Sequence, residues 1–399
     1  METLTGALSG LKVVEFAHVI AGPLAGTLLA DLGATVVHVE DPGSGDPQRS
    51  AGPAKNGIHL WWKVVGRNKR SVTLNLRTEE GRSVARELAA WADVVITNFR
   101  VETLEKWGLD WASLNAINPK VIVLSVSGFG SVGSRRNEPG FGKVGEAMSG
   151  VVNITGFPDG PPVHTGFSHG DSVTGLMGAF AISAALYRKT TDPDFKGEWV
   201  DLALYEGLFR LIEWQVIFYD QLGVAPQRVG NQLAAAPAAV INTFRTGDEK
   251  WITVTSGTPK SVRNVAELVG EPLEEYATPA DQVRNRQRLD GMVGEWISQR
   301  TLAECLATMK SLEVVASGIY SVEDILNDIT YQERENVITI EDPDLGPVRM
   351  QNVIPKLANY PGGIWRSAPS LGEDNDLVYG EYLGFDGEQL ARMVDEGTV

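Results

Sequence analysis

The chain has 399 residues, of which 43 % are hydrophobic and 22 % are charged. These fractions are those of a folded globular protein, and they exclude disordered, collagen-like and coiled-coil classes. The formal net charge of −16 disfavours a general binder of nucleic acid or of anionic membrane, because the mean field of the protein repels phosphate groups. At about 150 residues per domain, the length predicts roughly two to three domains.

The single cysteine, Cys305, can form neither an intramolecular disulfide nor a cysteine-based metal cluster. It therefore favours a reducing compartment and predicts a cytoplasmic protein. The first residues carry the acidic Glu2 and no basic segment, so no export signal is expected. The longest uncharged apolar stretch, Ser172–Tyr187, is shorter than a membrane span requires, so no transmembrane helix is expected.

The first half of the chain alternates β-branched apolar runs with helical patterns. Leu11–Phe16 predicts a strand, Ala21-Gly22-Pro23 a loop, and Leu24–Leu32 a helix that Gly33 ends. Four more runs predict strands and Glu79–Ala92 predicts a helix; the runs are Thr35–Glu40, Ser71–Leu76, Asp93–Phe99 and Val121–Val126. Strands that alternate with helices indicate an α/β fold with an open, doubly wound, Rossmann-like parallel sheet.

The residues Gly128–Gly133 match the spacing of a dinucleotide-binding glycine motif after a predicted strand. Arg135, Arg136, Asn137 and Pro139 follow where a helix would have to begin. The segment is therefore better interpreted as a glycine-rich loop.

The second half of the chain changes in composition. Two apolar helices are predicted at Ser172–Arg188 and at about Ala203–Leu222, followed by a Gly-, Pro- and Ala-rich connector. Val240–Arg245 and Trp251–Thr255 predict a hairpin, and charge-rich helical segments run from Val262 to about Lys310. We expect a large domain over 1–223, a small α+β domain over 224–318, and a return to the large domain over 319–399, with a strand at Val337–Ile340.

Several common catalytic and metal motifs are missing from the sequence. The five histidines (His18, His38, His59, His164 and His169) have no metal-ligand spacing, so no metal site is expected. No nucleophile elbow of the α/β-hydrolases and no phosphate-binding loop of the NTPases occurs either.

Asp171 is a lone acid that follows glycine and opens the most apolar predicted helix. An aspartate at this position commonly caps the helix, because the unpaired backbone N–H groups and the positive end of the helix dipole favour it. The alternative is that the same N–H groups keep the carboxylate ionised and directed at a ligand, as an oxygen nucleophile requires. Spacing alone leaves both interpretations open.

A local excess of basic residues stands out in this acidic chain. Two interpretations are open: a solvated basic face, or a phosphate-bearing ligand held at the edge of the sheet. The second fits the carboxyl ends of the predicted strands, at Leu76, Asn98-Phe99 and Phe16–His18. The basic residues are Lys63, Arg67, Lys69, Arg70, Arg77 and Arg82.

Taken together, short motifs along nearly the whole chain resemble the class III CoA-transferases, the CaiB/BaiF family that contains formyl-CoA transferase and carnitine CoA-transferase. The N-terminal matches are Gly10–Phe16, Ala21-Gly22-Pro23, Ala30–Ala34, Val39-Glu40, Gly43–Asp46, Asn68–Ser71 and Asn98-Phe99. The others are Ser127–Gly130, Ala147–Gly150, Thr155-Gly156, Gly160–Pro162, Gly170-Asp171, Leu345–Val348 and Pro369–Glu373.

The resemblance implies a large α/β domain built from both chain ends, a small central domain, and a homodimer of interlocked chains. It implies that Asp171 is the covalent nucleophile and that His18, Val19 and Ala21 line the thioester end of the site. It further implies no permanently bound cofactor, with coenzyme A and its acyl esters as substrates. By the same resemblance, CoA contacts fall at Leu74, Arg77, Asn98, Phe99, Arg100 and Lys106.

A rival activity on the same fold is that of the α-methylacyl-CoA racemases, which the chain also resembles. These enzymes pair the same aspartate with a histidine of a Gly-His-Asp segment, and here that segment is Gly140-Phe141-Gly142. A phenylalanine cannot carry a proton, so the substitution favours a transferase. A CoA-binding protein without catalysis is a third possibility, which the intact Gly170-Asp171 disfavours.

Departures from the family pattern bear on the substrate. Leu233–Pro237 stands where formyl-CoA transferase carries a run of glycines, so formyl and oxalyl substrates are disfavoured. Asp41 follows Glu40 where some members carry an arginine, so contacts to the nucleotide differ here. Five residues near the site could pair with a second carboxylate, which favours succinyl-CoA or another dicarboxylic donor, although the histidines among them could equally be ordinary loop residues. They are Arg135, Arg136, Lys143, His164 and His169.

Overall fold

The computed structural model describes residues 6–399, so the expected absence of an export signal concerns residues that lie almost entirely outside the described part. The chain forms two compact units. Unit 1 contains the N-terminal segment as far as Gly150, together with Thr165–Leu211 and Thr330–Val399, and unit 2 contains Val151–His164 and Ile212–Ile329. These limits differ from the domain boundaries expected at 223 and 318, because residues 151–164, 212–223 and 319–329 also belong to unit 2.

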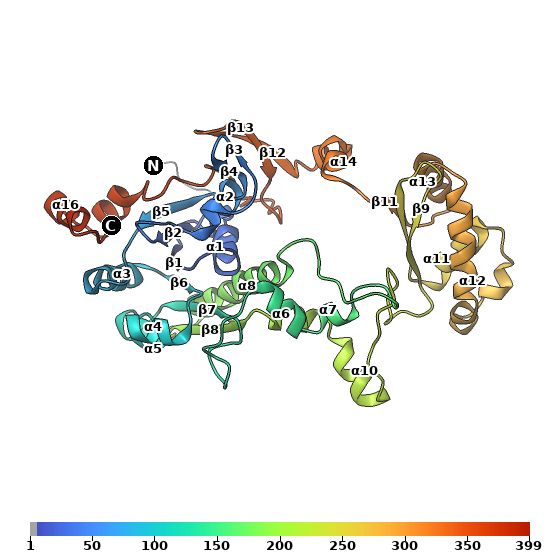
Figure 1. Cartoon of the computed structure of the whole chain (residues 1–399), viewed down its shortest axis with the longest axis horizontal. Helices are drawn as coiled ribbons and strands as arrows, with labels where there is room; N and C mark the ends of the chain where they lie inside the picture. Colours follow the sequence, from blue (N-terminus) through green and yellow to red (C-terminus); the bar gives the residue numbers. More distant parts are fainter. Residues whose placement is uncertain (1–5) are drawn as a thin grey trace. The chain divides into compact units, whose positions relative to one another are not determined.

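Unit 1 is built on a six-stranded sheet in the order β5-β2-β1-β6-β7-β8 (Figure 1). Each strand is paired in parallel with its neighbours, as the alternating pattern predicts. The strands are β1 (Lys12–Phe16), β2 (Thr35–Glu40), β5 (Lys69–Thr73), β6 (Val94–Thr97), β7 (Ile122–Ser127) and β8 (Glu198–Ala203).

Helices cover both faces of this sheet, because successive side chains of a buried strand point to opposite sides. Val13 packs with α1 (Ala21–Asp31) and α8 (His169–Thr191) in one core, whereas Val14 packs with α3 (Glu79–Trp91) in the other. Figure 1 shows α1 and α8 together beside the strands. The prediction of a doubly wound sheet is therefore confirmed for unit 1.

Two predicted elements near the sheet were wrong in extent. Ala21-Gly22-Pro23 is the first turn of α1 rather than a loop, since proline is tolerated there where no intrahelical N–H bond is needed. The helix predicted over Ala203–Leu222 is two helices, α9 (Glu206–Leu211) and α10 (Trp214–Leu222). The edge strand β8 before them was missed because it is only half-buried and carries Glu198 and Asp201.

The C-terminal segment Thr330–Val399 lies in unit 1 and covers β5. The N–H groups of Ser71 and Thr73 donate to Asp374 (3.0 Å) and Asn375 (2.9 Å), so the edge of the sheet is capped by side chains. The remaining elements of this segment are the antiparallel hairpin β12 (Val337–Asp342) and β13 (Gly346–Gln351), the π-helix η3 (Asp376–Tyr382) and α16 (Gly387–Asp395).

Shorter elements complete unit 1. The helices among them are α2 (Leu60–Val65), α4 (Val101–Trp107), α5 (Trp111–Ile117), α6 (Gly142–Met148) and the 3₁₀ turn η1 (Pro47–Ser50), and the hairpin is β3 (Ala54–Lys55) with β4 (Ile58–His59). The chain between β7 and α6 is a loop, which confirms the interpretation of Gly128–Gly133. α15 (Ile329–Glu333) spans the boundary between the units.

Unit 2 is an α+β unit with its own core. The predicted hairpin is confirmed: β9 (Val240–Arg245) pairs in antiparallel with β10 (Trp251–Ser256), and β11 (Ala316–Gly318) extends the sheet. Its other elements are α7 (Val151–Ile154), α11 (Pro259–Leu268), η2 (Leu273–Tyr276), α12 (Pro279–Ser298), α13 (Leu302–Ser311) and α14 (Val322–Asn327). Among the described residues, no helix has both the length and the apolar character that a membrane span demands.

Candidate active site

A cavity of about 520 Å³ in unit 1, called the Asp171 cavity below, lies at the carboxyl ends of the parallel strands. This is the edge where open α/β sheets bind ligands. Ligand-binding side chains therefore come from several loops that a rigid sheet holds in place. The lining residues are His18, Val19, Ile20, Ala21, Gln48, Ala51, Trp61, Asn98, Phe99, Val126, Ser127, Gly128, Gly140, Phe141, Gly142, Lys143, Ser168, Asp171 and Leu204.

Asp171 lies in the first turn of α8 and lines this cavity. The N-cap residue is Ser168, whose side chain makes no capping bond, and within residues 6–399 no hydrogen bond reaches the Asp171 carboxylate. The capping interpretation is therefore wrong. A carboxylate without an internal partner at the wall of a cavity is free to meet a ligand.

Glycines allow α6 to approach Asp171 closely. A β-carbon added at Gly142 would lie 2.1 Å from Oδ2 of Asp171, and one added at Gly170 would lie 2.7 Å from the Gly142 carbonyl oxygen. Similarly, a β-carbon at Gly140 would lie 2.6 Å from the Gly128 α-carbon. Only glycine fits such contacts, so this side of the cavity is made largely of backbone.

The environment of Asp171 raises its pKa to about 6. Burial is the main cause, the charge of Glu146 adds to it, and the charge of Lys143 opposes both. Backbone N–H groups of the helix are not among the causes of this shift, so they are not what keeps the carboxylate ionised. At pH 7 the ionised form still predominates by about ten to one.

Glu146 and Lys143 of α6 support the start of α8. Oε1 of the buried Glu146 accepts from the Gly170 N–H at 3.2 Å, and its Oε2 contacts Lys143 Nζ at 2.9 Å. Lys143 Nζ also donates to the carbonyl oxygens of Thr165 and Phe167, each at 3.0 Å. Lys143 thus lines the cavity, but its ammonium group holds the loop before Asp171.

The segment His18–Ala21 forms another part of the wall. His18 N–H donates to Asn98 Oδ1 (2.9 Å), the Asn98 amide donates back to the His18 carbonyl oxygen (2.7 Å), and the His18 ring packs edge-on against Phe99. Burial lowers the pKa of His18, so its imidazole is neutral at pH 7. Val19 has a φ of 68°, a strained conformation for a β-branched residue.

A buried chain of charges holds Val19 in that conformation. The Val19 N–H donates to both Asp46 oxygens at 3.1 Å, and Asp46 in turn forms an ion pair with His38 Nε2 at 3.2 Å. His38 Nδ1 contacts Glu15 at 2.8 Å, and Glu15 pairs with Lys69 at 2.9 Å. Burial opposes the charged form of His38, but the Asp46 and Glu15 carboxylates outweigh it and raise its pKa to about 9.

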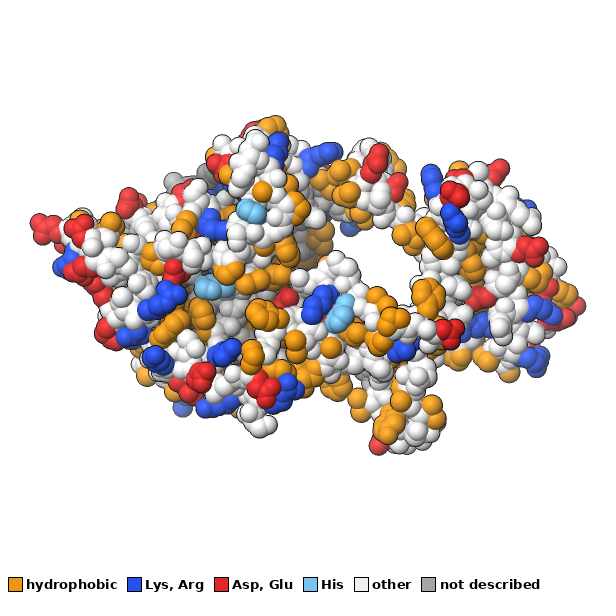
Figure 2. Space-filling view, viewed as in Figure 1, with side chains coloured by type: hydrophobic (Ala, Val, Ile, Leu, Met, Phe, Trp, Pro, Cys, Tyr) orange, Lys and Arg blue, Asp and Glu red, His pale blue; other side chains and the backbone are white. Residues whose placement is uncertain are grey.

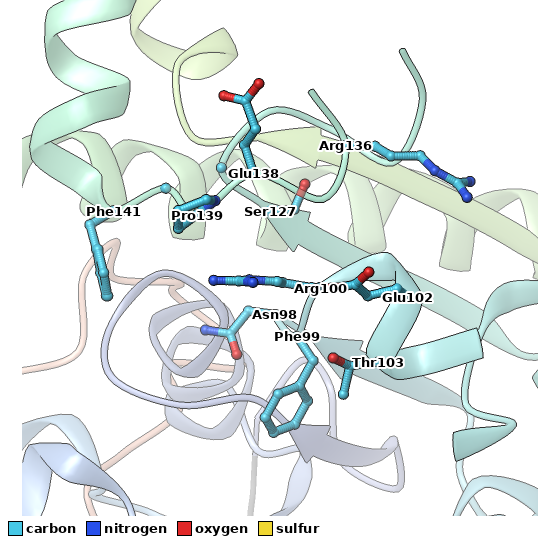
Figure 3. Close-up of a pocket in the computed structure, with 12 residues that line it drawn as sticks. Asn98, Phe99, Arg100, Glu102, Thr103, Ser127, Arg136, Glu138, Pro139 and Phe141 are labelled. Atoms are coloured by element: carbon cyan, nitrogen blue, oxygen red, sulfur yellow. The ribbon is translucent and has the colours of Figure 1, made fainter. Parts of the chain in front are cut away.

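A second cavity of about 380 Å³, the Arg100 cavity, adjoins the first. Figure 3 shows Arg100 extending between Asn98 and Pro139 towards Phe141, whereas Arg136 points away from Arg100. Within the described residues Arg100 has no carboxylate partner, while Arg136 lies 3.5 Å from Glu105. The two cavities share Asn98, Phe99, Ser127, Gly128, Gly140 and Phe141, so one extended ligand could occupy both.

The structure separates the predicted site residues into two groups. Asp171, His18, Val19, Ala21, Asn98, Phe99, Lys143, Arg100 and Arg136 line one or both cavities. The others lie outside both: Leu74 is buried in the core, Lys106 is exposed on α4, and His169 packs against Phe167. Arg77 pairs with Asp41 at 2.5 Å, and Arg135 pairs with Glu138 at 2.8 Å and lies over the Phe129 ring.

The basic stretch 63–82 is not a solvated face as a whole, because much of it is buried in ion pairs, whereas a phosphate contact by Arg77, whose side chain is 76 % exposed, stays a prediction. Lys63, Arg67 and Lys69 are buried, and each of the six basic residues pairs with a carboxylate. Most of these carboxylates are far from their basic partners in the sequence, so the spacing of residues could not predict the pairs. The pairs are Lys63 with Asp342, Arg67 with Asp31, Lys69 with Glu15, Arg70 with Asp374, Arg77 with Asp41 and Arg82 with Glu79.

Several wall residues escaped prediction, among them Gln48, Trp61 and Ser127. Gln48 and Trp61 carry no motif, and they reach the cavity only because η1 and α2 fold beside β2. Ser127 belongs to the glycine-rich loop motif, but nothing in the sequence shows that it faces a ligand. Among residues 6–399, no group of three or more His, Cys, Asp or Glu side chains is arranged to hold a metal ion.

Comparison with known proteins gives consistent matches over nearly the whole chain. The model of the family described as CoA-transferase family III matches residues 8–375. The chain is 38 % identical over 392 residues, 97 % of this chain and 96 % of the relative, to the succinyl-CoA--D-citramalate CoA-transferase of Chloroflexus aurantiacus. It is 33 % identical over 390 residues, 94 % of this chain and 95 % of the relative, to the succinate--glutarate CoA-transferase of Agrobacterium fabrum.

Among solved structures, the chain is similar to a CAIB/BAIF family protein from Brucella suis. The TM-score is 0.81 at 33 % sequence identity, and the match covers 95 % of this chain and all of that one.

Proposed function

Because this chain belongs to CoA-transferase family III, we propose that it moves coenzyme A from succinyl-CoA or another dicarboxylyl-CoA to a carboxylic acid, with Asp171 as the covalent nucleophile. The class of enzyme follows from the family, and the resemblance read from the sequence is confirmed. The dicarboxylic donor is supported by the names of two relatives, which combine succinyl-CoA or succinate with citramalate and glutarate. The nucleophile is supported by the unpartnered carboxylate in the cavity.

The reaction divides into four substitutions at carbonyl carbon. An Asp171 oxygen attacks the donor thioester, the C–S bond breaks, and a mixed anhydride and CoA thiolate form. The thiolate then attacks the Asp171 carbonyl carbon, releases the donor acid, and leaves an aspartyl-CoA thioester. The acceptor carboxylate displaces the thiolate to form a second anhydride, and the thiolate attacks the acceptor acyl carbon, which restores Asp171.

This chemistry requires a carboxylate that is shielded from water and that no neighbouring side chain blocks. The contact between Asp171 and Gly142 keeps water and side chains from one side of it, and His18 packs against Phe99 on the wall of the same cavity. Exclusion of water protects the anhydrides from hydrolysis. A pKa near 6 leaves Asp171 ionised at pH 7 and makes it a better nucleophile than an unperturbed carboxylate.

Coenzyme A is assigned to both cavities. The thioester end belongs beside Asp171, Val19 and Ala21, and the phosphates belong in the Arg100 cavity, where an unpaired guanidinium offers bidentate contacts. The CoA roles of Leu74, Arg77 and Lys106 stay predictions. For Leu74 only the backbone is available, because its side chain is 2 % exposed.

Phe141 supports transfer over racemisation. It lines both cavities, where a racemase would need a histidine to carry the proton. We therefore expect no exchange of the α-hydrogen when a chiral 2-methylacyl-CoA is incubated in deuterated water. Rapid exchange would favour the racemase instead.

We also propose that the protein is a homodimer of interlocked chains. Leu176, Phe180 and Tyr187 lie on one face of α8 and are 58 %, 71 % and 73 % exposed. On α10, exposed apolar side chains include Val216, Ile217 and Leu222, and Figure 2 shows the orange patch that they form on that helix. Light scattering during gel filtration tests this proposal, and a monomeric mass would refute it.

Intact-mass spectrometry of the enzyme with succinyl-CoA tests the main proposal. The expected result is a covalent adduct that peptide mapping places on Asp171. The adduct should disappear when an acceptor carboxylic acid is added. Transfer without any label on Asp171 would refute its role. Because the acceptor is unidentified, citramalate, malate and glutarate are the first acids to include.

A further inference from the structure

Gln48 is a buried polar residue at the wall of the Asp171 cavity that the proposed chemistry leaves unused. It is 1 % exposed, and its Nε2 atom is buried without a hydrogen-bond partner. Within the described residues, no hydrogen bond reaches either atom of its side-chain amide. A buried amide without a partner is unusual and costly, so an occupant of the cavity is the natural partner for this one.

The backbone of Gln48 is held rigidly, so its side chain starts from a fixed point of the cavity wall. In η1 the Gln48 N–H donates to Asp46 Oδ1 at 2.8 Å, and the Asp46 N–H donates to Glu40 Oε2 at 2.8 Å. The next residue, Arg49, is fixed by Glu40 at 2.6 Å and lies over the Trp62 ring. A side chain on such a support is preorganised for binding.

The basic residues that line the cavity beside Gln48, or that adjoin Gln48 in sequence, are engaged or uncharged. Lys143 is bound to Glu146 and to two carbonyl oxygens, and His18 is neutral at pH 7. Arg49, which follows Gln48 in the chain but does not line this cavity, is bound to Glu40. An oxygen of a ligand in this part of the cavity therefore meets a neutral donor, and the Gln48 amide can present its N–H₂ group by half a turn of its terminal torsion.

We propose that the side-chain amide of Gln48 binds an oxygen of the distal carboxylate of the acyl group, and that it thereby selects dicarboxylic over monocarboxylic acids. This inference rests on the proposed transferase function, whose acyl group lies in the same cavity as Gln48. A monocarboxylic acyl chain leaves the amide buried and unpaired, which penalises its binding. Gln48 is thus a specificity residue that takes no part in bond making.

The test compares succinyl-CoA with butyryl-CoA, which has the same number of carbon atoms and lacks only the distal carboxylate. Gln48→Met keeps the length of the side chain and removes the donor. We expect it to raise KM for succinyl-CoA about tenfold or more and to leave KM for butyryl-CoA unchanged or lower. Gln48→Glu should weaken succinyl-CoA further by charge repulsion, an effect that a merely structural role would not produce.

Thr97→Val is the matched control. Thr97 is also fully buried, and its Oγ1 also lacks a partner, but it does not line either cavity. This variant should keep the wild-type ratio of the two KM values. An equal rise for both esters in Gln48→Met, or an unchanged ratio, would overturn the inference.

The outcome separates this inference from the proposed function. If succinyl-CoA labels Asp171 in the wild type but Gln48→Met keeps the same preference, only the specificity role fails. If no thioester labels the wild-type enzyme, the transferase mechanism itself fails. If succinyl-CoA does not label Gln48→Met at all, its thermal unfolding is compared with that of Thr97→Val to find out whether the variant is folded. The ratio of the KM values of Gln48→Glu for succinyl-CoA and butyryl-CoA then decides whether residue 48 selects the acid.

Discussion

The carboxylate of Asp171 lies against the α-carbon of Gly142, with no room for a single methyl group between them: a β-carbon at residue 142 would be 2.1 Å from Oδ2. Gly142, the first residue of α6, is therefore as important to the position of Asp171 as the residues of its own helix. Backbone, rather than a side chain, shapes this side of the Asp171 cavity.

Gly142→Ala should reduce turnover at least a hundredfold, because the new methyl group displaces the nucleophile from its position of attack. The rate at which succinyl-CoA labels Asp171 is the measurement. Gly291→Ala is the control, since a β-carbon at Gly291 meets nothing within 4 Å. Full labelling activity in Gly142→Ala would show that Asp171 acts from another position.

Activity should fall as the pH decreases through about 6, because the protonated form of Asp171 is not nucleophilic. Glu146→Gln removes a negative charge that raises this pKa, so the acid limb should move to lower pH. The measurement is the pH dependence of the labelling rate between pH 4.5 and 8. An acid limb at the same pH in both proteins would exclude Glu146 as a cause.

Asp171→Asn should abolish transfer by more than a thousandfold while leaving CoA binding intact. It should also stabilise the fold at pH 8, by at most about 3 kcal/mol, because the folded-state pKa of about 6 exceeds the ordinary 3.8. The charged carboxylate destabilises the native state once the pH rises through this interval. Below about pH 3 the carboxyl group is protonated in both the folded and the unfolded state, so urea unfolding there should show no such gain.

The wild-type protein should lose stability as the pH rises from 6.5 through 9, because His38 then gives up the proton that links Asp46 to Glu15. The folded-state pKa of about 9 lies above the unfolded value of 6.5, so the contribution, about 3 kcal/mol, is complete only below pH 6.5. NMR titration of the His38 ring in the intact enzyme checks this directly. A midpoint near 6.5 would contradict it.

Arg100→Ala should raise KM for acyl-CoA esters about tenfold and change KM for the free acid much less, because Arg100 has no carboxylate partner to satisfy it in the described chain. Arg86→Ala is the control, since Arg86 pairs with Glu79 on the exposed side of α3. Equal changes for ester and acid would place the phosphates elsewhere, and Arg77 would then be the next residue to change.

The sequence predicts the centre of the sheet well and its edge poorly. β1, β2 and β7 are buried on both faces, so their apolar runs are continuous and their limits match to within a residue or two. β8 lies at the edge with polar residues among its apolar ones, and this mixed pattern does not distinguish a strand from a loop or a helix start.

The site was predictable where it depends on short motifs and unpredictable where it depends on tertiary contacts. Gly170-Asp171 identifies the candidate nucleophile, but the raised pKa comes from burial and from Glu146, whose approach no spacing reveals. The basic residues Lys63 and Arg70 suggested a ligand, yet their partners Asp342 and Asp374 lie in the C-terminal segment. The cluster of basic residues in the sequence overstated their part in ligand binding, because the carboxylates that neutralise them lie far away in the sequence.

The wall of the Asp171 cavity is built from separate segments of the chain. Asn98, Phe99, Ser127 and Gly128, which the adjoining Arg100 cavity also uses, come from the ends of β6 and β7, whereas Gln48, Ala51 and Trp61 come from a single excursion after β2. Under the proposed function, the wall residues at the ends of β6 and β7 hold coenzyme A, and the segment after β2 contacts the acyl group. Substitutions confined to that one segment would then change the preferred acid and leave the CoA contacts as they are, which is a simple way for related enzymes to diverge.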